Sequence, residues 1–150
     1  MKSSAAIKRD RVILNIVPIV IGCILLKVVL SVCSDSQLPD PAKGLSISST
    51  LISVWATCLG FMITAVSILL ALDSSKYIEM LKATGHYKTI LICLMICCSH
   101  VLVAFIIALV ITFVQEWSVL TFAVMCASTI DVLTTMLFSL YFLWKIVIKY

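Results

Sequence analysis

The sequence predicts an all-α polytopic membrane protein, a bundle of four transmembrane helices that forms one domain over residues 1–150. Composition is the first reason: 63% of the residues are hydrophobic and only 12% are charged. Soluble domains carry about 25% charged residues, so most of this chain must face lipid or itself. Four long apolar runs are the second reason, because a helix needs about 20 such residues to cross a bilayer.

The four runs are separated by polar segments that contain turn residues. They cover residues 12–32, 46–72, 89–114 and 118–144. The first run is longer than the ~7–15 apolar residues of a signal sequence, so we expect it to be retained as a span. Pro39, Pro41 and Gly44 lie between the first two runs, where we expect them to interrupt the helix.

Basic residues predict the orientation, because Lys and Arg are retained on the cytoplasmic side during insertion. Nine of the eleven lie in the N-terminal arm, in the 73–88 segment or in the C-terminal tail, whereas the opposite connections contain only Lys43. Both termini and the 73–88 segment are therefore expected on the cytoplasmic side of the membrane.

The 73–88 segment has the pattern of a short amphipathic helix. Asp73 or Ser74 can cap its start and Gly85 can follow its end. One interpretation is a connector that lies on anionic headgroups. The other is a docking platform for a cytoplasmic protein, formed by Lys76, Glu79, Lys82, His86 and Lys88.

Three ionisable side chains lie inside the predicted spans, namely Lys27, His100 and Asp131. At 1.5 Å per residue, they fall within about one helical turn of one another in depth. Because a charge in the bilayer interior is costly, we expect Asp131 to accept a hydrogen bond from Lys27 or His100. Three interpretations remain: a functional cluster in a cavity or permeation path, a structural contact, or a Lys27 that extends to the outer interface.

The second run has small and weakly polar residues at steps of three and four. We call them the small-residue stripe: Thr50, Ser53, Thr57, Gly60, Thr64 and Ser67. Helices in lipid pack closely through residues of this kind. The stripe is expected to contact another helix of the same chain, or to line a subunit interface or a pore.

The sequence predicts no enzyme and no cofactor. The seven cysteines are odd in number and contain no Cys-x-x-Cys, so they do not form a disulfide framework. Cys93, Cys97 and His100 share one helical face, but a fourth metal ligand is not evident and burial opposes thiolate formation, so no metal site is predicted. Hydrolase and phosphate-binding motifs are absent from the sequence.

The region from Gly60 to Leu72, continued by Asp73 to Ile78 and Leu81 to Lys88, is the most distinctive part of the chain. Together with the four-span topology, it resembles small membrane proteins of bacterial anti-phage defence systems, of which the membrane subunit of the Kiwa system is the nearest. The resemblance implies an inner-membrane homo-oligomer, with a tetramer as a candidate, that senses infection and signals to a cytoplasmic, DNA-binding partner. It implies no individual functional residues and no direct nucleic-acid binding by this chain.

Two classes of function follow. The first is a sensor or scaffold in a defence complex that acts through its cytoplasmic face. The second is a small ion channel, holin-like pore or transporter that uses Lys27, His100 and Asp131.

Overall fold

The computed structural model describes residues 4–32, 40–71, 76–83, 86–115 and 117–147. These residues are almost entirely helical and include no β-strand, which confirms the all-α class. Four helices are long and apolar enough to cross a membrane. The elements are α1 (Ser4–Val32), α2 (Pro41–Ala71), the short α3 (Lys76–Ala83), α4 (His86–Val114) and α5 (Val119–Val147).

The long helices extend beyond the apolar runs from which they were predicted. Helices α1, α4 and α5 each contain 29 residues, a length of about 43 Å at 1.5 Å per residue. The hydrocarbon core of a bilayer is only about 30 Å thick. The helix ends therefore reach the headgroup region, which is why hydropathy alone does not locate them.

The start of α2 differs from the prediction that Pro41 and Gly44 interrupt the helix. Helix α2 begins at Pro41, and the Gly44 amide donates to the Asp40 carbonyl at 2.9 Å. Proline is well suited to the first turn of a helix, where its missing N–H has no helical acceptor. Pro39 lies outside the described residues.

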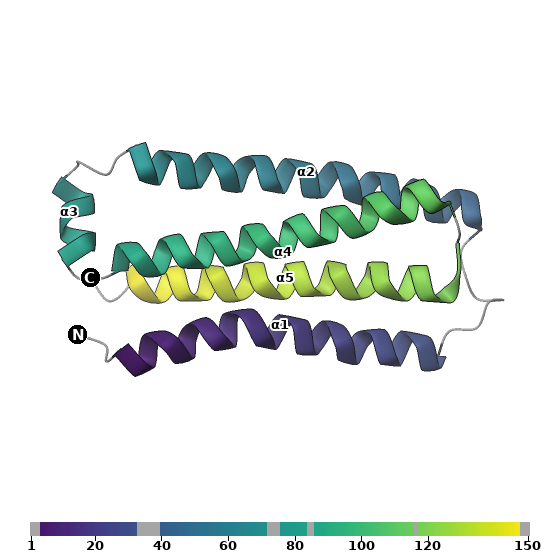
Figure 1. The fold of residues 1–150 in the computed structure, drawn as a ribbon, viewed down its shortest axis with the longest axis horizontal. Coiled ribbons are helices and arrows are strands. Elements are labelled where there is room, and N and C mark those ends of the chain that lie inside the picture. Colours follow the sequence, from purple (N-terminus) through teal and green to yellow (C-terminus); the bar gives the residue numbers. More distant parts are fainter. Residues whose placement is uncertain (1–3, 33–39, 72–75, 84–85, 116, 148–150) are drawn as a thin grey trace.

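The four long helices form an open row, in which α2 packs on α4, α4 on α5, and α5 on α1 (Figure 1). Helices α1 and α2 are therefore the two edges of the row. A core between α2, α4 and α5 contains Trp55, Val101, Ala104 and Val132. Many large apolar side chains point outward, including Phe61 and Phe113, which are 73% and 82% exposed, as expected of surfaces that face lipid or another protein.

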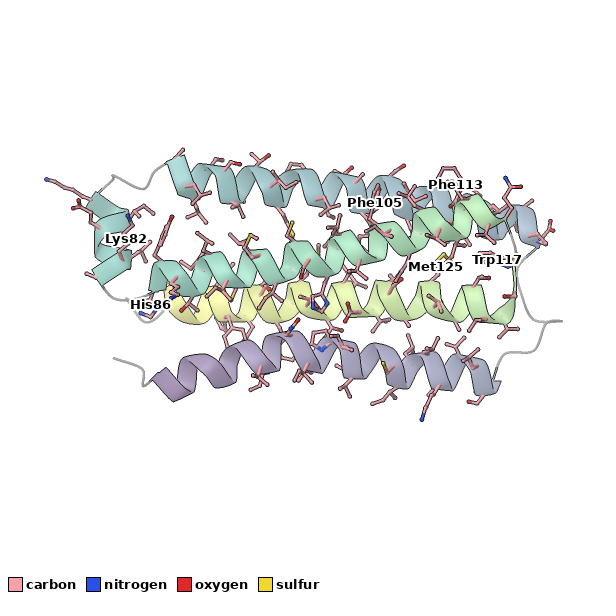
Figure 2. The ribbon with its side chains drawn as sticks, viewed as in Figure 1. Lys82, His86, Phe105, Phe113, Trp117 and Met125 are labelled. Atoms are coloured by element: carbon pink, nitrogen blue, oxygen red, sulfur yellow. The ribbon has the colours of Figure 1, made fainter. Side chains whose placement is uncertain are left out.

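One end of the row is held by a close contact between α2 and Trp117. Gly44 is buried there, and a Cβ atom at this position would overlap the Trp117 indole ring. Gln115 ends α4 with a positive φ of 55°. Ser118 and Thr121 then exchange backbone-to-side-chain hydrogen bonds at the start of α5. Figure 2 shows Trp117 at this end, opposite Lys82 and His86.

The short helix α3 occupies the other end of the row (Figure 1). It packs against α4, and Ile78 is its buried residue. Lys82 lies 5.6 Å from the centre of the Tyr87 ring, and the Tyr87 hydroxyl donates to the Leu69 carbonyl in the last turns of α2 at 3.5 Å. These contacts join α3, α4 and α2.

Candidate functional site in the membrane interior

The candidate site is a contact between His100 of α4 and Asp131 of α5. His100 Nδ1 and Asp131 Oδ2 are 2.7 Å apart, and the two side chains are 8% and 20% exposed. Each residue lies near the middle of its 29-residue helix. The pair is therefore near the centre of the membrane, where an isolated charge costs about 2.5–3.5 kcal/mol on insertion scales.

Two further polar side chains complete the contact, and we call these four residues the imidazole cluster: Asn15, His100, Asp131 and Thr135. Asn15 Oδ1 of α1 lies 3.1 Å from His100 Nε2. Thr135 Oγ1 lies 3.3 Å from His100 Nδ1 and donates its own hydrogen to the Asp131 carbonyl at 2.8 Å. The cluster therefore joins α1, α4 and α5 around one ring.

The carboxylate of Asp131 is only partly satisfied. Its Oδ1 atom is buried and has no hydrogen-bond partner in the described part of the chain. A buried polar atom without a partner costs about 1–3 kcal/mol. This atom distinguishes the cluster from a fully paired structural contact and indicates a place where charge or a further donor is accommodated.

Gly22 brings α1 close to α5 beside the cluster. A Cβ atom at this position would lie 3.3 Å from the Ala127 carbonyl oxygen and 3.6 Å from the Asp131 Cβ. The first distance is tighter than most Cβ contacts. Because Gly22 has no side chain, it allows the α1 backbone to pack closely against α5, the helix that carries Asp131.

The structure does not place Lys27 in this cluster, contrary to one expectation from the sequence. The Lys27 side chain is exposed, and it lies five residues before the end of α1 at Val32. That is about 7–8 Å along the axis, within reach of the headgroups for a long, flexible lysine. Of the three interpretations, this geometry favours a Lys27 that extends to the interface.

Sequence analysis did not assign Asn15 and Thr135 to the site. Asn15 is an uncharged polar residue in an apolar run, and it takes the position expected for Lys27. Thr135 follows Asp131 by one helical turn, a spacing that places both on one face. A polar residue at the same depth as an ionisable residue was the available signal in each case.

All six residues of the small-residue stripe are exposed on α2, which favours the second of the two alternatives, a subunit interface or a pore, over contact with another helix of the same chain. The opposite face of α2 packs on α4, where Ser48 Oγ lies 3.1 Å from the Ala108 carbonyl and 2.8 Å from Thr112 Oγ1. A Cβ atom at Gly60 would meet nothing within 4 Å. The stripe is therefore open to lipid or to another protein.

The residues expected to dock a partner lie at the α3 end. Lys76, Glu79, Lys82 and Lys88 are exposed, and His86 is half-buried at the start of α4. Cys93 and Cys97 are buried on α4. No group of three or more His, Cys, Asp or Glu side chains in the described residues could hold a metal ion.

The fold and this site together define a class: a multi-pass membrane protein of four long helices with a polar cluster that joins three of them. No protein-family model, curated protein or solved structure matches the chain.

Proposed function

We propose that this chain is a sensor or scaffold subunit of the bacterial inner membrane, which forms a homo-oligomer and recruits a cytoplasmic effector protein. The observation that carries the proposal is the outward position of the complete small-residue stripe on α2, an edge helix of the row. The proposal includes a topology with both termini and α3 in the cytoplasm.

The stripe favours contact with a second copy rather than with lipid alone. Ser49 and Ala56 are also exposed on α2, so small residues recur at four-residue steps, for example from Ala56 to Gly60. Such spacing lets two helix backbones approach closely in a membrane. The hydroxyls already donate to carbonyls of their own helix, as Thr57 does to Ser53 and Thr64 to Gly60, both at 2.8 Å. A partner helix can therefore cover them without leaving donors unpaired.

The expected cytoplasmic face offers a surface for the effector. Helix α3 is held on α4 by buried Ile78 and by Lys82, which lies over the Tyr87 ring, so its charged side chains project from a fixed support. Lys76, Glu79 and Lys82 are exposed on it. A fixed, charged surface suits protein recognition because complementary charges guide association and fix its register.

The defence setting follows from the resemblance to small four-span proteins of anti-phage systems. A subunit of that kind would detect disturbance of the envelope through its membrane helices. It would pass the signal to the effector through the face that carries α3.

The first experiment measures oligomeric mass and bound protein after gentle detergent extraction from the native host. We expect a homo-oligomer that retains a cytoplasmic protein. Thr57→Leu and Gly60→Leu, which enlarge the stripe, should dissociate the oligomer, whereas the control Val54→Leu, at an exposed α2 position outside the stripe, should not. A monomeric wild-type protein, or stripe variants that assemble normally, would contradict the proposed interface.

Recruitment is tested separately by reversing charge on α3. Lys76→Glu combined with Lys82→Glu should release the co-purifying protein and leave the oligomer intact. Retention of the bound protein by this variant would show that the effector docks elsewhere.

The imidazole cluster favours a second candidate function, an ion or proton pathway. The buried, unpartnered Oδ1 of Asp131 is the specific observation behind it. Flux measured in liposomes should then fall in Asp131→Asn and remain in Lys27→Met. Liposomes that stay tight with the wild-type protein would exclude this candidate.

A further inference from the structure

The atoms around His100 allow its hydrogens to be counted. Nε2 faces Asn15 Oδ1 at 3.1 Å and Nδ1 faces Asp131 Oδ2 at 2.7 Å. The third neighbour, Thr135 Oγ1, donates its hydrogen to the Asp131 carbonyl and can only accept from the ring. With the Asn15 amide in this orientation, Nε2 carries the hydrogen of its bond to Asn15, and a second hydrogen lies between Nδ1 and Oδ2.

Two arrangements satisfy this count, and they have the same net charge. In one, an imidazolium faces a carboxylate; in the other, a neutral imidazole accepts from a protonated Asp131. Both are neutral overall, which suits a pair near the centre of the membrane. Loss of one hydrogen would leave a net negative charge beside the buried Oδ1, which has no partner to stabilise it.

Loss of the hydrogen on Nε2 also changes the contact with α1. Two acceptors, Nε2 and Asn15 Oδ1, would then face each other at hydrogen-bond distance. The repulsion between these two acceptors is relieved only if the Asn15 amide turns over to present its NH₂ group, or if α1 moves away. Asn15 is exposed on its outer side, so either change can occur without unpacking α4 from α5.

None of the other titratable side chains that the structure describes forms a hydrogen bond with Asp131 Oδ1. Asp131 is the acidic group that faces His100 from α5. Helix α4 carries the thiols of Cys93, Cys97 and Cys98, and the other long helices carry those of Cys23 (α1), Cys58 (α2) and Cys126 (α5). From α1, Lys27 is exposed and lies twelve residues from Asn15, about 18 Å along the helix. Asn15 is thus the described α1 side chain that senses the hydrogen on Nε2.

We propose that the imidazole cluster is a proton-binding site whose occupancy is linked to the position of α1. When the proton is bound, Asn15 connects α1 to His100 of α4, and Gly22 provides the close backbone contact between α1 and α5. Loss of the proton breaks the bond between Nε2 and Asn15 Oδ1, and α1 is released unless the Asn15 amide turns over. Because linkage is reciprocal, displacement of α1 by a partner or by membrane tension promotes release of the proton.

The first part of the test determines the protonation of each ring nitrogen by solid-state NMR of labelled histidine in bilayers. The chain has two histidines, so His86→Gln leaves a single ring to observe. We expect Nε2 to carry a hydrogen and Nδ1 to share a short hydrogen bond that disappears in Asp131→Leu. If His86→Gln does not fold, that loss identifies the His100 signal in the wild-type spectrum. An unprotonated Nε2 in the wild-type protein would overturn the proposal.

The second part measures the position of α1 with spin labels at Ser31 and Leu120, two exposed sites near the same end of α1 and α5. The native cysteines are replaced first, and the histidine spectrum must be retained. We expect the distance distribution to broaden as rising pH removes the imidazole proton, and this response to be lost in Asn15→Leu. An α1 position that does not change when the proton leaves, or that changes equally in Asn15→Leu, would refute the linkage.

Discussion

Helix α4 makes two buried polar contacts that differ in chemistry. Toward α2, Ser48 Oγ lies 3.1 Å from the Ala108 carbonyl and 2.8 Å from Thr112 Oγ1, so its single hydrogen can go to either, and Thr112 donates to the same carbonyl at 2.9 Å. We call this group the hydroxyl contact. Its members are uncharged, and the Ser48 side chain is completely buried. Two hydroxyls and one carbonyl satisfy one another, which is what a packing contact requires.

The imidazole cluster connects the other side of α4 to α5 and α1. It contains two ionisable groups, it leaves Asp131 Oδ1 unpaired, and it draws residues from three helices. A contact that only joined helices could be made by hydroxyls at a lower cost in free energy, because no charged group would be buried, as in the hydroxyl contact. The difference indicates that the ionisable pair has a role beyond packing, since it retains an energetic cost that the other contact avoids.

Breaking the imidazole cluster should give the largest loss of stability. Asp131→Ala removes the acceptor of a buried imidazole, and loss of one partner from a buried ionic pair costs about 3–5 kcal/mol. Unfolding in mixed micelles, followed by circular dichroism, measures the change. The double variant Asp131→Ala with His100→Leu should recover much of the loss, because removing both partners leaves no unpaired group. If the double variant is less stable than Asp131→Ala, the ionic pair is not the source of the effect.

The α1 side of the cluster depends on close packing at Gly22. Gly22→Leu places a side chain against Ala127 and Asp131, and overpacking of this kind costs about 1–3 kcal/mol. The same unfolding measurement detects the loss. Gly60→Leu is the matched control, because nothing lies within 4 Å of a Cβ atom there, and it should leave the stability of the monomer unchanged. Equal losses in the two variants would mean that α1 does not pack closely against α5 at Gly22.

The four long helices, and the depth of His100 and Asp131 within them, could be predicted from the sequence. Hydropathy is a property of each run by itself, so four spans could be predicted without any knowledge of their neighbours. The helix ends were less accurate: α2 begins at Pro41 rather than at residue 46, because first-turn residues are set by capping and not by hydropathy.

The partners of each residue could not be predicted in the same way. Depth places Lys27, His100 and Asp131 at a similar level, but it does not fix the direction in which each side chain points around its helix. Lys27 is exposed and Asn15 contacts His100 instead. The small-residue stripe shows a similar limit. Its spacing predicts close packing, but in lipid both faces of α2 are compatible with the apolar surroundings, so the spacing does not identify the helix it contacts.

Weakening the hydroxyl contact should have a smaller effect than breaking the imidazole cluster. Ser48→Ala leaves Thr112 bonded to the Ala108 carbonyl, so no polar group remains unpaired. Hydrogen bonds between membrane helices average about 0.6 kcal/mol in double-mutant cycles, and a loss of this order is expected in the unfolding assay. A loss comparable to that of Asp131→Ala would remove the distinction between the two contacts.

Replacement of Lys27 should have the smallest effect and tests whether the imidazole cluster is complete without it. Lys27→Met keeps the length of the side chain and removes its charge. Because Lys27 is exposed, the free energy of unfolding should change by no more than about 0.5 kcal/mol, and the NMR signal of His100 should not move. A shift of that signal would place the Lys27 ammonium within electrostatic range of Asp131. The unpaired Oδ1 would then be the acceptor of a lysine, and the ionisable pair would become a triad with a different proton count.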